Sequence, residues 1–418
     1  MMDRISQLPD ALLLRILSTV PAKDVVATRL LSRRWESLWK MVPELQYDDS
    51  SHTYEYWRFS RFVDRSLLLN EAPVLESLQL KLGPKCGAVD VGIWVKLAVD
   101  RRVSKMTIHY SSTERPIKLP MSLYTCDSLM VLVLNNGILV DVPDLVCFPS
   151  LKILHLDFVK YAGDESVLRF LSNCPVLEDL VVKRCHNDNV TTFVVTVPTL
   201  QRLYVYRTSE KVQDGDDLTF SINAPSVKHF GITDYHDISS LAENMPVVEE
   251  ANIDVTYSNT EKLLGSLTSV KCLSLCLNTS KAAYPTGSIF YRLVYLELCT
   301  CVSEWMNLLM LLLKDCPNLR VLKLDERHTP DTDEPRPSWN QPSSVPECLL
   351  FHLENFEFQR YGGNQEEKEL VIYILKNANR LKMASISPKS TDLEEKFRMI
   401  KELALSSRGS TECELVFE

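Results

Sequence analysis

From residue 75 onward, one short pattern of apolar and polar positions recurs along the chain. Its form is apolar-x-x-apolar-x-apolar, as in LESLQL at residues 75–80 and LKILHL at residues 151–156. The second half of the pattern alternates between apolar and polar residues, which predicts a strand with one buried face. The copies begin at Leu75, Val103, Leu129, Leu151, Leu177, Leu200, Val227, Val248, Val270, Leu293 and Leu319, with looser copies at Leu353 and Leu381.

The spacing of these copies predicts how the strands are connected. A fixed phrase repeated at intervals of roughly 20–29 residues is the signature of leucine-rich repeats. Successive strands are then parallel, and a crossover segment must join each pair. Residues 164–174 and 302–316 carry apolar side chains at helical spacing, which predicts helical crossovers there. We therefore expect an α/β solenoid of parallel strands with helical or irregular crossovers, whose stacked repeats share one core.

The first forty residues show a helical pattern instead. Pro9 stands at the first turn of one predicted helix, and Pro21 opens the next. Three short helices are defined by Leu12, Leu13, Ile16 and Leu17, then by Val25, Val26 and Leu30, and then by Leu31, Trp35 and Leu38. A unit of about 40 residues buries too little surface to be stable alone. Its spare apolar surface is therefore expected to dock on the rest of the chain or on another protein.

Residues 8–17 (LPDALLLRIL), 23–28 (KDVVAT) and 31–39 (LSRRWESLW) resemble the F-box motif. In that family the three helices bind a Skp-type adaptor, which connects to a cullin scaffold and a RING subunit that recruits the ubiquitin-conjugating enzyme. Ala11 stands where many members have an acidic residue, at a position expected to tolerate the change. Carried over by position, the resemblance implies adaptor contacts from Leu8, Pro9, Leu12, Ile16, Val25, Leu31, Trp35 and Leu38.

The last eighty residues begin with a segment of different composition. Residues 331–346 are rich in proline, serine and acidic side chains, which predicts a linker. Residues 365–377 follow as a predicted helix with Leu370, Tyr373 and Ile374 on one face. A second helix is predicted to start at Thr391, with Glu394 completing a capping box. This helix is expected to end at Gly409 and to carry Leu393, Phe397 and Ile400 on one face, before a final strand at residues 413–417.

The order of Trp339, residues 345–358, the YGG triplet at 361–363 and residues 369–382 resembles the FBD domain. This module follows leucine-rich repeats in many plant F-box proteins, and by physics it caps the solenoid. We expect four parts: an F-box at residues 1–43, repeats at 44–330, a linker at 331–346 and an FBD domain at 347–418.

Composition limits the function further. The chain has 418 residues and a formal net charge of −9, which argues against a general nucleic-acid binder. No run of 18 apolar residues predicts a membrane-spanning helix, and residues 11–20 lack the features of a secretory leader. The cytosol or the nucleus is the expected location. The twelve cysteines are then expected to be reduced thiols.

Two cysteines should be neighbours on adjacent strands, because Cys276 and Cys299 occupy the same position of successive repeats. A metal site formed by Cys272, Cys276, Cys299 and Cys301 is one alternative, although these spacings match no ordinary zinc pattern. Small buried or half-buried thiols are the simpler interpretation, and no cofactor is predicted.

No sequence signature of an active site is present: there is no phosphate-binding glycine loop, His-Glu-x-x-His or Gly-x-Ser-x-Gly. We therefore expect a binding protein. Outward positions of the central repeats carry tyrosines and basic residues, which are common in binding hot spots. The candidates for a target-binding face are Lys183, Arg202, Tyr204, Tyr206 and His229, with Arg184 and Arg207 one position along. Solvated side chains on an open sheet are the alternative interpretation.

The resemblance implies a non-catalytic substrate-recognition subunit of an SCF-type (Skp-cullin-F-box) E3 ubiquitin ligase. Its F-box would bind the adaptor and its repeats a target protein for ubiquitin-dependent degradation. Two alternatives remain open. One is a co-receptor of the same architecture that needs a hormone-like small molecule. The other is an F-box scaffold protein that binds the adaptor without delivering a substrate.

Overall fold

The structure is a computed structural model. It describes residues 5, 7–49, 56–112, 116–185, 187–207, 218–235, 238–255, 261–277, 289–301, 304–328, 339 and 341–418, without the side chains of residues 218, 238–243 and 261. The chain divides into two compact units, Met1–Ala224 and Pro225–Glu418.

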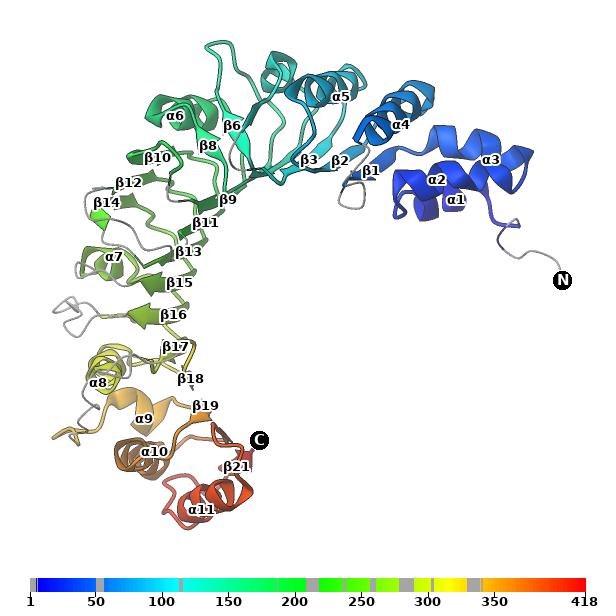
Figure 1. The fold of residues 1–418 in the computed structure, drawn as a ribbon. Helices are drawn as coiled ribbons and strands as arrows, with labels where there is room; N and C mark the ends of the chain where they lie inside the picture. The colour runs from blue at the N-terminus through cyan, green and yellow to red at the C-terminus, as the bar shows by residue number, and fades with distance from the viewer. Residues whose placement is uncertain are drawn as a thin grey trace. The chain divides into compact units, whose positions relative to one another are not determined.

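The first unit begins with the three predicted helices (Figure 1). These are α1 (Asp10–Leu17), α2 (Ala22–Ala27) and α3 (Arg33–Leu38), with 3₁₀ turns η1 (Thr28–Leu30) and η2 (Trp39–Met41). Pro9 and Pro21 are the N-cap residues of α1 and α2. The side chains buried among these helices include Leu13, Leu17 and Trp35. The single apolar stripe predicted for the first helix is wrong, because Leu13 and Leu17 face inward while the adjacent residues on the helix face solvent.

A parallel sheet follows in the first unit, in the order β1-β2-β3-β5-β7-β9-β11. The strands are β1 (Glu44–Asp48), β2 (Ser77–Leu82), β3 (Lys105–Tyr110), β5 (Val131–Asn136), β7 (Ile153–Asp157), β9 (Asp179–Arg184) and β11 (Arg202–Arg207). The predicted repeat pattern thus yields parallel strands, while β1 is an additional strand that the pattern did not predict.

The core of this sheet consists of rows of aliphatic side chains that continue from strand to strand. Leu78, Met106, Leu132, Leu154, Leu180 and Leu203 form one such row in register. All six are fully buried. Because each repeat contributes one member, no single repeat could bury this surface by itself.

Helices and short strands connect these repeats in the first unit. The helices are α4 (Tyr56–Leu69), α5 (Ala88–Asp100), η3 (Met121–Thr125) and α6 (Asp164–Ser172). The short strands β4 (Ile117–Lys118), β6 (Ile138–Val140) and β8 (Lys160–Tyr161) form a small parallel sheet, and β10 (Thr192–Thr196) pairs with β12 (Leu218–Asn223). The helix predicted at residues 164–174 is confirmed as α6.

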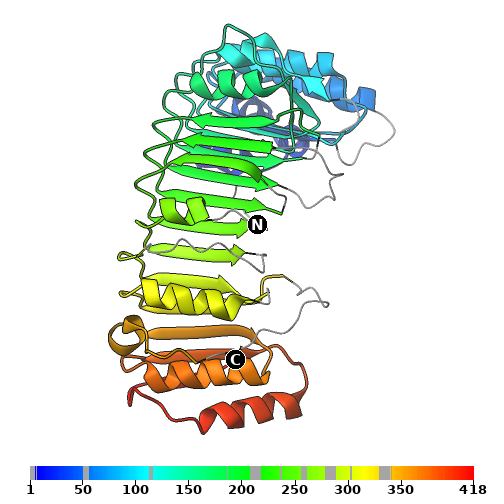
Figure 2. The same cartoon turned by 90° about the vertical axis from the view of Figure 1, so that its left-hand side faces the viewer.

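The second unit contains a parallel array in the order β13-β15-β16-β17-β18-β19-β20-β21 (Figure 2). Its strands are β13 (His229–Asp234), β15 (Glu250–Val255), β16 (Cys272–Leu277), β17 (Tyr295–Cys299), β18 (Val321–Asp325), β19 (Asn355–Tyr361), β20 (Met383–Pro388) and β21 (Glu414–Phe417). A further strand, β14, spans Ile238–Asn244. The predicted final strand at residues 413–417 is confirmed as β21.

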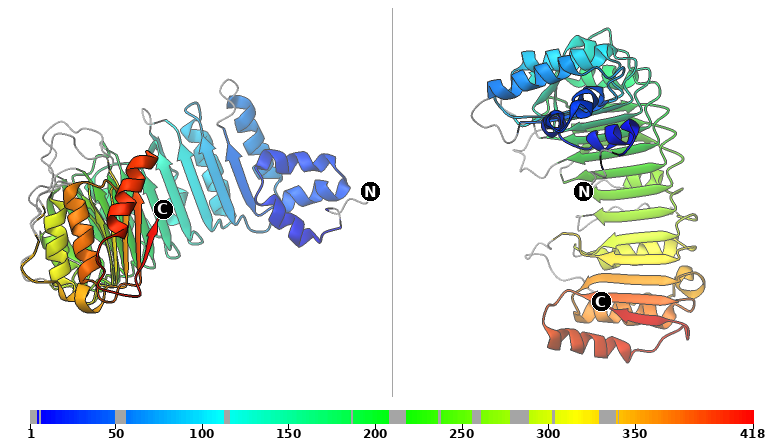
Figure 3. Two further views of the ribbon diagram at one scale, coloured as in Figure 1. Left: turned by 90° about the horizontal axis from the view of Figure 1, so that it is seen from below. Right: turned by 90° about the vertical axis from the view of Figure 1, so that its right-hand side faces the viewer.

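The described helices of this unit lie on one face of the strands, and none of them covers the opposite face (Figure 3). They are α7 (Glu261–Ser266), α8 (Trp305–Asp315), α9 (Glu347–Phe351), α10 (Gln365–Asn377) and α11 (Leu393–Ala404). The predicted helix at residues 365–377 is confirmed as α10, with Leu370, Tyr373 and Ile374 buried together. Apolar face residues of α8 and α10 pack inward, which completes the core of the second unit.

Three details predicted for α11 are wrong. The N-cap is Asp392, whose carboxylate accepts from the Glu394 N–H, so Thr391 does not cap the helix. The helix ends at Ala404, well before Gly409. Its buried residues are Met399 and Leu403, because packing selects a stripe rotated away from the predicted one. Leu393 and Phe397 of the predicted stripe are exposed.

Most of the predicted linker at residues 331–346 lies outside the described residues; of its positions, only 339 and 341–346 are described. No helix among the described residues has the length and apolar character needed to cross a membrane.

Candidate functional site

The first helix presents apolar side chains to solvent. Leu12 is 44% exposed and Ile16 is 48% exposed, although Leu13 and Leu17 next to them are buried. Residues four positions apart lie on the same face of a helix. Leu12 and Ile16 therefore form one outward apolar pair on α1, whereas the pair one position further along supplies the core.

A second outward pair follows the second helix. Leu30 at the end of η1 is 82% exposed, and Leu31 is 67% exposed. Ile5 and Met41 are also exposed. Isolated apolar residues on a surface are ordinary, but several exposed ones within the first 41 residues are of the kind found at docking surfaces.

The eight predicted adaptor contacts occupy two kinds of environment. Pro9, Leu12, Ile16 and Leu31 are exposed, and Leu8 is half-buried. In contrast, Val25, Trp35 and Leu38 are buried among the three helices. These three side chains support the surface from behind and offer a partner little area. Sequence reasoning also missed Leu30, because its position in the helical pattern suggested the interior face.

An ion pair fixes the start of the first helix. The Arg34 Nε atom on α3 donates to Asp10 Oδ1 at 2.9 Å, and Arg34 also donates to the Leu8 carbonyl oxygen. Asp10 lies in the first turn of α1, where a carboxylate is favoured by the helix dipole. This contact links α1 to α3, while burial of Leu13 and Leu17 leaves Leu12 and Ile16 facing outward.

Three family models match the chain. The F-box domain model matches residues 5–47, which include all of these exposed residues. A model described as the LRR repeats of an FBD-associated F-box protein matches residues 91–213, and the FBD model matches residues 341–386.

Relatives match over the full length. An F-box/FBD/LRR-repeat protein of Arabidopsis thaliana is 54% identical, across 100% of this chain and 99% of the relative. The chain belongs to the F-box/FBD/LRR-repeat family. A probable FBD-associated F-box protein of the same organism is 49% identical over 100% of both chains.

The outward face of the repeats in the first unit carries most of the predicted target-binding residues. Strand register places Arg202 opposite Asp179, and Tyr206 opposite Lys183. Arg202 forms an ion pair with Asp179, and Lys183 Nζ lies 3.1 Å from Asp157 Oδ2. The predicted positive charges are therefore already neutralised by carboxylates on the neighbouring strands.

The tyrosines of this face form a stacked pair on the same strand as Arg202. The Tyr204 and Tyr206 rings stack with their planes 9° apart and their centroids separated by 6.4 Å. Both side chains are half-buried. The last candidate, His229, lies in the second unit, where its Nδ1 atom is 3.0 Å from Glu250 Oε2.

Arg184 and Arg207 do not belong to the outward face, because both are buried. Arg184 donates to both carboxylate oxygens of Asp188, at 2.6 and 2.8 Å, and to the Val190 carbonyl oxygen. Its guanidinium lies 5.4 Å from the Phe193 ring centroid. The strand's alternation turns this arginine inward, where it joins β9 to the segment before β10.

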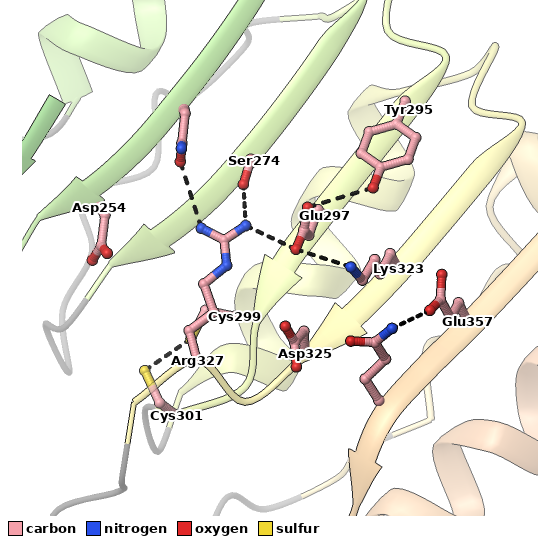
Figure 4. A network of polar contacts seen from close by, with 12 residues as sticks. Asp254, Ser274, Tyr295, Glu297, Cys299, Cys301, Lys323, Asp325, Arg327 and Glu357 are labelled. Atoms are coloured by element: carbon pink, nitrogen blue, oxygen red, sulfur yellow. Dashed lines mark hydrogen bonds and ion pairs between the residues drawn. The ribbon is translucent and has the colours of Figure 1, made fainter. Parts of the chain in front are cut away.

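Sequence reasoning missed a polar network on the outward face of the second unit (Figure 4). Arg327, which follows β18, donates to Ser274 and forms a 2.9 Å ion pair with Glu297. The same carboxylate lies 3.4 Å from Lys323 Nζ, and Asn252 accepts from Arg327. Strand register makes Asn252, Ser274, Glu297, Lys323 and Glu357 one polar row.

Charge and burial compete in this network. Burial alone would raise the pKa of Glu297, but hydrogen bonds and positive charge from Arg327 and Lys323 outweigh it and hold the pKa below its usual value. Burial and the neighbouring Glu297 carboxylate raise the pKa of Tyr295 to about 12. The carboxylate thus remains charged at neutral pH, and Arg327 links side chains of three strands, Asn252, Ser274 and Glu297. The repeat pattern could have placed the strand residues of this network on the outward face. It could not have placed Arg327, which lies outside the pattern.

Proposed function

We propose that this F-box/FBD/LRR-repeat protein is a non-catalytic substrate-recognition subunit of an SCF-type ubiquitin ligase. Its parts would be the F-box at residues 1–43, repeats at 44–330, a linker at 331–346 and the FBD domain at 347–418. The F-box would bind a Skp-type adaptor and, through it, a cullin and a RING subunit. The repeats would hold a target protein near the ubiquitin-loaded enzyme, raising the local concentration of target lysines.

The observation that carries this proposal is the outward apolar surface within the F-box match. Leu12, Ile16 and Leu31 are exposed and coincide with positions that the F-box resemblance assigns to adaptor contact. Fully burying one leucine or isoleucine side chain stabilises a complex by roughly 1.5–3 kcal/mol before the losses on association. Val25, Trp35 and Leu38 would act by holding the helices in place, since their side chains are buried.

For the target-binding face we propose the outward residues Lys183, Arg202, Tyr204 and Tyr206 of the first unit, with His229 as a separate contribution from the second. The stacked tyrosines supply rigid apolar area, which favours hot-spot contacts. The paired Arg202 and Lys183 would recognise a target by exchanging Asp179 and Asp157 for acidic groups of that target.

The test is reconstitution of the full chain with a purified Skp-type adaptor, a cullin and a RING subunit. The complex is expected to assemble in equal proportions and to transfer ubiquitin to a captured target. Assembly without ubiquitin transfer to any target would favour the scaffold interpretation. Failure to bind the adaptor would contradict the proposal.

A matched pair of variants makes this test specific. Leu30→Asp alters an F-box residue that is 82% exposed, and Leu145→Asp alters a leucine in the repeats that is 80% exposed. The first is expected to weaken assembly by at least about 10-fold, since a charge would enter an apolar interface. The second should leave assembly unchanged.

A further inference from the structure

Three thiols converge at the end of two adjacent strands in the second unit. Cys276 belongs to β16, Cys299 ends β17, and Cys301 follows two residues later. The Cys299 and Cys301 sulfur atoms are 3.0 Å apart, and those of Cys276 and Cys301 are 3.5 Å apart. All three sulfur atoms lie within 4.8 Å of one another. Cys276 and Cys299 are therefore neighbours, as the repeat pattern predicted.

The backbone explains why the thiols meet. Leu275 and Leu298 are partners in the parallel register of β16 and β17, so Cys276 and Cys299 come next on the two strands. β17 ends at Cys299, and the chain beyond it brings the Cys301 sulfur beside the other two.

Nitrogen and oxygen ligands stand beside the thiols. Ligand atoms of Asp254, Cys276 and His328 form a second group within 4.8 Å, so Cys276 is common to both. His328 Nε2 lies 3.1 Å from Asp254 Oδ2, and Tyr235 donates to the same carboxylate oxygen. A carboxylate that holds a histidine ring in place is a frequent companion of metal-binding histidines. These residues come from β15 and from the segments that follow β13 and β18.

We propose that Cys276, Cys299, Cys301 and His328 form a structural zinc site, with Asp254 orienting the histidine. Three cysteines and one histidine are an established ligand set for closed tetrahedral zinc. Sulfur atoms bound to zinc at about 2.3 Å in a tetrahedron lie about 3.8 Å apart. The observed separations of 3.0 and 3.5 Å are shorter, so the thiols must spread around the ion. His328, which groups with Cys276 but not with Cys299 or Cys301, must turn toward them.

The zinc would fasten the ends of β16 and β17 to the segment after β18. The three thiols become thiolates when zinc binds, and their protons pass to solvent. The sequence-based alternative that included Cys272 is revised, since Cys272 lies at the opposite end of β16 and belongs to neither group. Sequence analysis offered the three cysteines as metal ligands but missed His328, which lies 27 residues beyond Cys301 (328 − 301) and outside the strand pattern.

Zinc binding by the purified full-length chain tests the proposal. After equilibration with Zn²⁺ and dialysis under reducing conditions, elemental analysis should find about one zinc per chain. Cys276→Ser and Cys301→Ser should each lower zinc affinity at least about 10-fold, and Asp254→Asn about 10- to 100-fold. Cys272→Ser, a change on the same strand, is the matched control and should retain the metal.

Zinc content that is equal in all variants, or absent from the wild-type chain, would overturn the proposal. So would a disulfide between two of the three cysteines in protein purified with reductant. A second measurement needs no variant: Co²⁺ added to the wild-type chain should give the intense sulfur-to-cobalt absorption of a tetrahedral thiolate site. A spectrum without this absorption would contradict the assignment even if a variant failed to fold.

Discussion

The N-terminal helices and the outward faces of the repeat strands both meet solvent, but with different chemistry. The helices expose unpaired apolar side chains such as Leu12, Ile16 and Leu31. The strands expose charges that are paired with the neighbouring strand, such as Arg202 with Asp179. Covering an apolar surface with a partner lowers the free energy of the complex. A paired charge, in contrast, must give up its present carboxylate before it can bind one from a partner. This difference is what the proposed function requires: a docking surface for the adaptor on the helices, and selective contacts with a target on the repeats.

Within the F-box the sharpest test separates supporting residues from contact residues. Trp35→Ala removes a buried side chain and is expected to lower the free energy of unfolding by about 3–5 kcal/mol. Leu31→Ala removes an exposed one and should change it by less than about 0.5 kcal/mol. Denaturant unfolding of the full chain, followed by circular dichroism, measures both. Equal losses would show that the two groups do not differ in role.

Within the repeats the same distinction applies to charge. Asp188→Ala leaves the Arg184 guanidinium buried without its carboxylate and should cost about 3–5 kcal/mol. Asp179→Ala breaks the more exposed pair with Arg202 and should cost no more than about 1 kcal/mol. Parallel urea titrations compare the two variants. A small loss for Asp188→Ala would contradict a structural role for the buried pair.

The polar network in the second unit predicts a pH dependence. The folded-state pKa of Glu297 is lowered, so its stabilising contribution is present above the unfolded pKa of about 4.3 and disappears as the pH falls through the folded value. Glu297→Gln should therefore lower stability by about 1–2 kcal/mol at pH 7, with little effect in strong acid. The test compares the melting temperatures of the wild type and of Glu297→Gln from pH 7 down into acid. A difference that persists unchanged in acid would contradict the ion-pair account.

Only a modest effect on stability is expected on the proposed target face. Replacing Arg202, Tyr204 and Tyr206 by alanine together should cost no more than about 1–2 kcal/mol, because all three side chains are partly exposed. The same variant should lose capture of the target protein in cross-linking experiments, while adaptor binding is retained. Unchanged target capture would remove this strand from the proposed face.

The repeat pattern predicted most of the fold because it depends on local alternation. Each apolar phrase became a parallel strand, and the helices at α6, α8 and α10 were predicted from their apolar spacing. The failures have a common cause, since helical periodicity locates a face only approximately. It placed Leu12 and Ile16 with Leu13 and Leu17, and it chose the wrong stripe on α11, where tertiary packing selects Met399 and Leu403.

The apolar repeat pattern could not predict contacts between segments that are distant in the sequence. The sequence predicted that Cys276 and Cys299 would be neighbours, because strand register follows directly from the repeat. It gave no sign that His328 and Arg327 would join the same strands. Those residues follow the end of β18, where no periodicity constrains their position. Alternation places Arg184 on the inward face, but it gave no sign that Asp188, four residues away, would pair with the buried guanidinium.

The central claim is that the outward pair on α1 binds the adaptor. Titration calorimetry of a purified Skp-type adaptor into the full chain measures this with the double variant Leu12→Asp, Ile16→Asp and with the control Leu145→Asp. The double variant is expected to bind at least about 100-fold more weakly, with its unfolding transition retained because neither side chain is buried. The control should bind like the wild type. Adaptor affinity in the double variant equal to that of the wild type would contradict the assignment.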